Sequence, residues 1–297
     1  MKRSMLFNTT LISHSIFSPG SMSWKLGWLQ DEQPSKQGNI LELLNKANQL
    51  IQSADSKEKV LELMDTYKNA LKIDSKNREA LTGAAQYSCL IGIGYSDKNE
   101  EKRTYFLKTI NRCEQIMYLN NQFAALVDND EQAWEACRVL SKIELEALWF
   151  FYLGVSSLWK DCLSVIGKII NIKWTKRGKI LLKNMMEIDP EWNAGTPYYG
   201  WANYYAAAPS FAGGDLKKAE EYYCKAIEMG PEMLNFRRTR ALLLHTKNKD
   251  KEAFKKDLMW VLSQDPKKTN EFLTYPWRVF LQRDSQYMLD HIDDYFK

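Results

Sequence analysis

Histidines and paired carboxylates are the residues of this chain that could carry out acid–base or metal chemistry. The three histidines are His14, His245 and His291. No two of them have the helical or loop spacing with which two histidines share a metal ion. The acidic pairs Asp128/Asp130 and Asp293/Asp294 could act as a general acid and base only if the fold joined them in a pocket. His245 sits near the predicted end of a helix, where an imidazolium interacts well with the helix dipole.

The five cysteines offer no further chemistry. They are Cys89, Cys113, Cys137, Cys162 and Cys224. None belongs to a CxxC pair, so we expect buried thiols rather than a zinc site or a disulfide framework. The sequence also has no GxSxG, HExxH, GxxxxGK[ST] or GxGxxG motif. We therefore predict a protein that is not an enzyme and that uses no catalytic residue, metal or cofactor.

Aromatic side chains are the more informative feature of the sequence. They make up 12% of the chain, including ten tryptophans and fifteen tyrosines. Six lie close together in the segment PYYGWANYYAAAPSF: Tyr198, Tyr199, Trp201, Tyr204, Tyr205 and Phe211. The first five share a predicted helix and surround much of it, so some must face the core while others face a groove or a partner. These six are the candidate ligand- or partner-binding residues.

The charge pattern disfavours a nucleic-acid partner. The net charge is only +4, and basic residues alternate with acidic ones along most of the chain. One basic run comprises Lys168, Lys173, Lys176, Arg177, Lys179 and Lys183. Such a run could meet an anionic membrane surface or an acidic partner, but it is more often the solvated face of a helix.

Helices must position these residues, because apolar residues recur every three to four positions from residue 39 onward. Asn77 can cap one of these helices. Residues 97–127 and 131–159 are predicted as two long helices, the second apolar all round and therefore buried. Strand signals are nearly absent, since the chain lacks Asn-Gly and Asp-Gly turns and alternating β-branched runs. The fold class is predicted to be all-α.

The helices are predicted to pair into hairpins that end at Pro190, Pro231 and Pro266. These prolines are about 41 and 35 residues apart, close to the roughly 34-residue tetratricopeptide (TPR) unit. The longer spacing can be accommodated by AAAPSFAGG between two helices. The residues predicted to pack the repeats are Phe150, Leu153, Gly154, Gly200, Gly213, Gly214, Ala219, Tyr223, Ala226 and Pro231. The pattern indicates a TPR-like helical-hairpin solenoid or bundle with irregular repeats.

Two regions are distinguished along the chain. Residues 1–38 are predicted to be a flexible or targeting N-terminal segment, because prolines, glycine and serines accompany a broken apolar run. Residues 39–297 are predicted to form a single TPR-like α-helical domain.

A family resemblance rests on several segments. The most specific is GGDLKKAEEYYCKAIEMGPEM, which follows PYYGWANYYAAAPSFA. EALWFFYLGVSSLWK and ILLKNMMEIDPEW extend it upstream, and EAFKKDLMWVLSQDP and MLDHIDDYF extend it downstream. Over about residues 40–296 the chain resembles the T component (TatT) associated with tripartite ATP-independent periplasmic (TRAP) transporters.

The resemblance implies a non-enzymatic accessory role in a TRAP-type transport system. It implies a TPR-like periplasmic or cell-envelope-associated protein that binds the substrate-binding P component, with an apolar organic molecule as a further candidate ligand. It also implies a homo-oligomer, a trimer in the family. The alternative is a cytoplasmic TPR scaffold for protein complexes, because polar residues interrupt the N-terminal apolar run and no cysteine lies in the first 88 residues.

Overall fold

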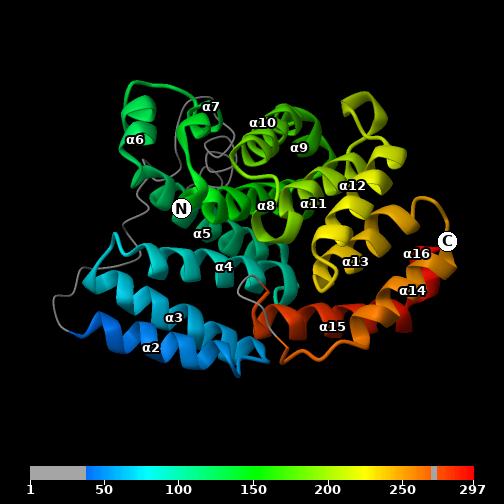
Figure 1. Ribbon diagram of the computed structural model, residues 1–297, viewed down its shortest axis with the longest axis horizontal. Helices are drawn as coiled ribbons and strands as arrows, with labels where there is room; N and C mark the ends of the chain where they lie inside the picture. The colour runs from blue at the N-terminus through cyan, green and yellow to red at the C-terminus, as the bar shows by residue number, and fades with distance from the viewer. Residues whose placement is uncertain (1–37, 269–272) are drawn as a thin grey trace, which may run out of the picture. The chain divides into compact units, whose positions relative to one another are not determined.

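The computed structural model describes residues 38–268 and 273–297, and every regular element within these ranges is helical (Figure 1). The all-α prediction is therefore confirmed for the described part of the chain, while the segment predicted at residues 1–38 lies almost entirely outside it. The longer helices are α2 (Ile40–Ile51), α3 (Lys57–Ile73), α4 (Arg78–Gly94), α5 (Asn99–Tyr118), α6 (Asn121–Asp128), α8 (Leu145–Cys162), α10 (Lys173–Ile188), α11 (Trp192–Ala207), α12 (Leu216–Met229), α14 (Lys251–Leu262) and α15 (Tyr275–Asp290). Shorter helical segments are α7 (Ala133–Ala136), η3 (Cys137–Val139), η4 (Lys142–Glu144), α9 (Val165–Ile170), η5 (Ser210–Ala212), α13 (Leu234–Arg240), η6 (Ala241–His245) and α16 (Ile292–Tyr295).

The chain divides into two compact units. Of the described residues, the first unit contains 38–46 and 64–184, and the second contains 47–63, 185–268 and 273–297. Unbroken stacking of TPR-like hairpins over residues 39–297 stays a prediction.

Helix boundaries follow local capping chemistry. The Asn77 side chain accepts a hydrogen bond of 3.0 Å from the backbone N–H of Ala80, which confirms the predicted cap of α4. Asp215 caps α12 in the same way, with bonds of 3.1 Å from two backbone N–H groups of the first turn. Helices α10, α12 and α14 each end within a few residues before a proline, as the hairpin pattern predicts.

The prediction of two uninterrupted helices over 97–127 and 131–159 was wrong. Asn120 takes an extended conformation after α5, and its side chain accepts hydrogen bonds from the first N–H groups of α6. In the second region Leu140 is extended, and Ser141 and Glu144 form a capping box that starts a new helical segment. At each break the caps supply partners for N–H groups at the start of the next helical segment, which offsets the helical hydrogen bonds that the break removes.

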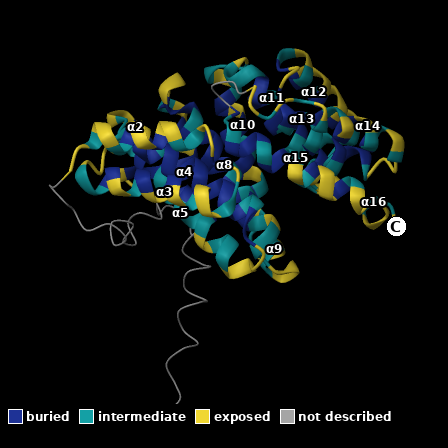
Figure 2. Cartoon of the chain, turned by 90° about the horizontal axis from the view of Figure 1, so that it is seen from below, coloured by how far each residue is buried: buried dark blue, intermediate teal, exposed yellow. Residues whose placement is uncertain are grey.

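The core of the first unit is formed by α4, α5 and α8, and most residues of α4 and α8 are buried (Figure 2). Gly154 on α8 lets the helices approach closely, because a Cβ there would lie 3.2 Å from Ile110 and 3.3 Å from Thr109 of α5. Gly92 on α4 faces the Phe106 ring in a similar way. Most of α8 is buried, as its apolar sequence predicts.

The second unit contains the hairpin of α11 and α12. Helices α13 and η6 contact this hairpin, and α14 and α15 pack against each other and against α13. Phe254 of α14 is fully buried and anchors the end of the chain, since its ring centroid lies 5.6 Å from that of Tyr295 and 5.2 Å from that of Phe296. Met288 of α15 completes this cluster. Across the described ranges, no helix has both the length and the apolar character that crossing a membrane requires.

Candidate functional site

The aromatic helix α11 starts from an unusual backbone. Asn193, Ala194 and Gly195 all have positive φ, at 48°, 53° and 85°. This left-handed run costs energy for the two residues that carry a side chain. Regular helix follows at once, with Thr196 donating a 2.8 Å hydrogen bond to the Asn193 carbonyl and Pro197 in the first regular turn, where its missing N–H is not needed. The kink therefore sets the direction in which α11 presents its rings.

The glycine pair after α11 then returns the chain so that α12 lies beside it. Gly213 has a φ of 96°, which glycine adopts without strain. At Gly214 a Cβ would lie only 1.9 Å from the carbonyl oxygen of Ala208, so no side chain fits there. The Asp215 N–H donates a 3.0 Å hydrogen bond to the Tyr205 carbonyl and ties the start of α12 to the end of α11.

Two of the six predicted aromatic residues are buried in the structure of the unit. Tyr199 packs on Tyr223 and Phe236, and its hydroxyl shares a 2.8 Å hydrogen bond with Thr239. The Tyr204 hydroxyl donates a 2.5 Å hydrogen bond to the Ala212 carbonyl and holds the turn. Both side chains thus have structural partners.

Three of the remaining predicted rings are half-buried and gather with one residue of α12. We call Tyr198, Trp201, Tyr205 and Tyr222 the aromatic surface. The Tyr205 centroid lies 5.5 Å from that of Trp201 and 5.5 Å from that of Tyr222, and Tyr198 lies 5.9 Å from Tyr222. The hairpin therefore holds four rings from two helices as one preformed group.

Sequence reasoning missed Tyr222, because its neighbour Tyr223 carried the packing pattern. The clue was that adjacent residues on a helix face different directions, so a ring next to a buried ring is exposed to another surface. Burial, with neighbouring Tyr205 and Tyr198, raises the pKa of Tyr222. Lys218 adds a cation 5.6 Å from the Tyr205 centroid. Such a surface can stack on apolar or planar groups and donate hydrogen bonds, but it lacks an acid–base pair.

Phe211 stands apart from the aromatic surface. It lies on η5 between the two helices and is 83% exposed, and it makes no ring contact with another described residue. The structure therefore places it in the turn of the hairpin rather than among the stacked rings.

The residues predicted to pack the repeats differ in their surroundings. Ala219, Tyr223 and Ala226 are the buried residues of α12, and the Tyr223 hydroxyl donates a 2.6 Å hydrogen bond to Asn203 of α11. Phe150, Gly154 and Gly200 are buried, Leu153, Gly213 and Gly214 are half-buried, and Pro231 is exposed just after α12.

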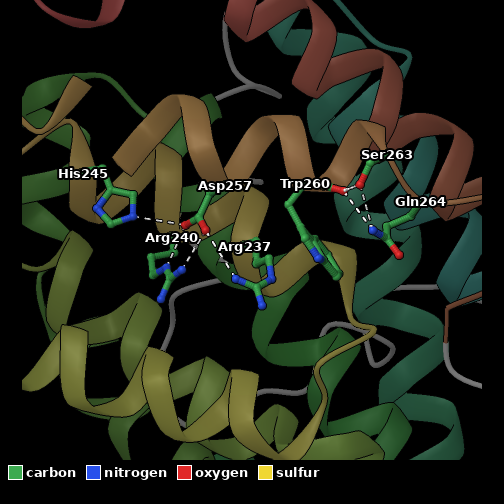
Figure 3. A network of polar contacts seen from close by, with 7 residues as sticks. All are labelled: Arg237, Arg240, His245, Asp257, Trp260, Ser263 and Gln264. Atoms are coloured by element: carbon green, nitrogen blue, oxygen red, sulfur yellow. Dashed lines mark hydrogen bonds and ion pairs between the residues drawn. The ribbon is translucent and has the colours of Figure 1, made fainter. Parts of the chain in front are cut away.

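His245 belongs to a network of charges around the buried carboxylate of Asp257 (Figure 3). Arg240 binds both carboxylate oxygens at 2.7 Å, His245 Nε2 lies 3.1 Å from one of them, and Arg237 Nη1 lies 3.6 Å from the other. The Arg237 guanidinium also stacks on Trp260, 4.4 Å from the ring centroid. His245 thus pairs with a carboxylate as well as lying near the end of a helix.

This network fits a structural role better than a catalytic one. Burial alone raises the pKa of Asp257, but hydrogen bonds from His245 and Arg240 outweigh it and hold that pKa below its usual value. Hydrogen bonding to Asp257 likewise outweighs burial at Arg240 and raises its pKa. A carboxylate held ionised by several cations is a poor proton acceptor.

The acidic pairs and the thiols also have ordinary surroundings. Asp128 accepts a 2.8 Å hydrogen bond from Tyr118, and Asp293 pairs with Lys251 at 2.6 Å. Cys89, one of three fully buried thiols, has a pKa raised by burial. Within the described ranges, no group of histidine, cysteine and acidic residues is arranged to hold a metal ion.

The comparison with known proteins finds the same family as the resemblance, over a shorter part of the chain than residues 40–296. The model of a protein family described as TAtT, the TRAP transporter T-component, matches residues 118–296. The matched region includes α11, α12 and therefore the whole aromatic surface. No curated protein matched the chain.

Proposed function

The chain belongs to the TRAP transporter T-component family, and from this premise we propose that it is a non-enzymatic accessory component of a TRAP-type transport system. In this role it lies in the periplasm or at the cell envelope and binds the substrate-binding P component. We also propose that the chain forms a homo-oligomer, which is a trimer in the family.

The aromatic surface is the observation that supports partner binding. Tyrosine and tryptophan dominate the energy of protein interfaces because they offer a large apolar area at a low cost in side-chain entropy. Here the Tyr205 ring packs against Trp201 on its own helix and against Tyr222 on α12, so these rings lose little conformational freedom on binding. The half-buried state of these rings leaves part of each face for a partner.

The same surface suits an apolar organic molecule as a second ligand. Flat rings about 5.5 Å apart between centroids can cover one side of such a molecule, while tyrosine hydroxyls orient its polar end. We place this ligand on the surface occupied by the partner, so that the two compete or bind together there.

The test is the affinity of the full chain for a TRAP substrate-binding protein from the same organism, measured by calorimetry. Trp201→Ala should weaken binding at least about tenfold, as truncation of an interface anchor does. Tyr287→Ala is the matched control, because this tyrosine is 56% exposed on α15 and lies outside the surface. Equal affinity of Trp201→Ala and the parent protein would refute the surface as the docking site.

A cytoplasmic TPR adaptor remains the alternative hypothesis. Fractionation of cells that express the full gene separates the two. Recovery from the periplasm or envelope supports the transport role, and recovery only from the cytosol with an intact N-terminus refutes it.

A further inference from the structure

Helix α9 presents an apolar face to solvent. Ser164 caps it by accepting a 3.1 Å hydrogen bond from the Gly167 N–H. Its four exposed aliphatic residues are Val165 at 74%, Ile166 at 70%, Ile169 at 67% and Ile170 at 68%. They occupy positions i, i+1, i+4 and i+5, which lie on one side of a helix. Figure 2 shows the exposed colour over most of α9.

This apolar face lies within a basic stretch of chain. Between residues 162 and 184 there are six basic residues and no acidic one. Lys173 and Lys176 follow α9 directly and are exposed. Lys168 lies within α9 itself, with its ammonium group 5.7 Å from the ring centroid of Trp159.

One basic residue of this stretch, Arg177, is buried and fixes the start of α10 in place. Contrary to a wholly solvated basic face, Arg177 is buried, and its guanidinium carbon lies 3.7 Å from the Trp134 centroid and 4.9 Å from the Trp174 centroid. Burial lowers the pKa of Arg177. Because Arg177 and Trp174 fix α10 to the unit, Lys173 and Lys176 are held in place beside α9.

We propose that α9 and the start of α10 form a peripheral docking surface for an anionic lipid bilayer. Exposed aliphatic side chains flanked by lysines match the apolar interior and the negative headgroups of such a bilayer. A short helix can lie in the plane of the headgroups without crossing the bilayer. A second copy of the chain fits less well, because a two-fold contact through this surface would place its lysines against their own like charges. An acidic protein would satisfy the lysines but gains less from the aliphatic face.

Vesicle co-sedimentation of the full chain tests this surface. The vesicles are phosphatidylcholine with about 30% phosphatidylglycerol, and pure phosphatidylcholine vesicles are the comparison. Ile169→Asp should reduce binding to anionic vesicles at least tenfold, since it puts a negative charge into the exposed apolar face that the bilayer would cover. Lys176→Glu should reduce it at least about fivefold, the contribution of one basic residue near an anionic surface.

Matched controls come from the same unit. Ile143→Asp replaces an equally exposed isoleucine, at 68%, and Lys76→Glu reverses an exposed lysine in the turn between α3 and α4. The proposal expects both controls to bind like the parent protein and binding to fall in pure phosphatidylcholine.

Three results would overturn the proposal. The first is equal binding of parent and α9 variants, and the second is equal loss in the controls. The third is a change of oligomer mass by Ile169→Asp with vesicle binding unchanged, which would assign α9 to a contact between copies. None of these measurements uses the substrate-binding protein. The membrane proposal is therefore tested independently of the transport role.

Discussion

Replacing Asp257 with asparagine removes the one carboxylate at the centre of the buried charge network. The side chain of Asp257 is 3% exposed. Its carboxylate accepts two hydrogen bonds of 2.7 Å from Arg240 and lies 3.1 Å from His245 Nε2. Asparagine has nearly the same shape, so the change isolates the charge. It also turns an NH₂ group toward at least one of the cations.

The expected cost is set by the cations that lose their partner. Removing one member of a buried ion pair costs about 3–5 kcal/mol, because the remaining charge stays buried without compensation. Asparagine retains one acceptor oxygen, so we expect about 3 kcal/mol. This is a large fraction of the roughly 5–15 kcal/mol by which most domains are stable.

Urea denaturation at pH 7, with hydrogen exchange read over α13 and α14, measures the cost where it arises. Asp293→Asn is the control, because the Asp293 side chain is 89% exposed and its pair with Lys251 lies in solvent. We expect Asp257→Asn to lower the urea midpoint and to speed exchange in both helices, while the control changes neither. If the two variants have the same midpoint, the carboxylate does not hold these elements together and the reasoning is refuted.

Three further predictions concern the same chain. Gly214→Ala should destabilise the protein by about 1–3 kcal/mol and lower Tm by several degrees, because the new Cβ would clash with the Ala208 carbonyl. Gly167→Ala should be tolerated, because a Cβ there would lie at an ordinary contact distance from its neighbours. Acid should destabilise the parent more than Asp257→Asn. The folded pKa of this carboxylate is depressed, so its stabilisation is full above about pH 5 and is lost as the pH falls below about 4, which urea midpoints across that range will show. A thiol reagent should modify the exposed Cys224 first and reach the three buried thiols only on unfolding, as timed mass spectrometry can follow.

Features set by nearby residues could be predicted from the sequence. The all-α class, the Asn77 cap and the ends of α10, α12 and α14 before prolines depend on a few adjacent positions. The aromatic segment could be predicted for the same reason, since five of its six rings lie in one helix. Its division into buried and half-buried rings depends on which neighbours α11 meets.

Features set by tertiary contacts could not be predicted from the sequence. Tyr222 joins the aromatic surface only because the glycine turn brings α12 alongside α11. Arg177 looked like part of a solvated basic face, yet Trp134, more than forty residues earlier, buries it. The breaks at Asn120 and Ser141 were hidden because polar caps occurred inside continuous helical periodicity.

The proposed role in transport is tested most directly by native mass spectrometry of the full chain mixed with a TRAP substrate-binding protein from the same organism. We expect a complex of defined stoichiometry for the parent protein and for Tyr287→Ala, and a marked loss of that complex for Trp201→Ala. If parent and partner are detected only as separate species at micromolar concentrations, the chain does not act as an accessory component that binds this protein.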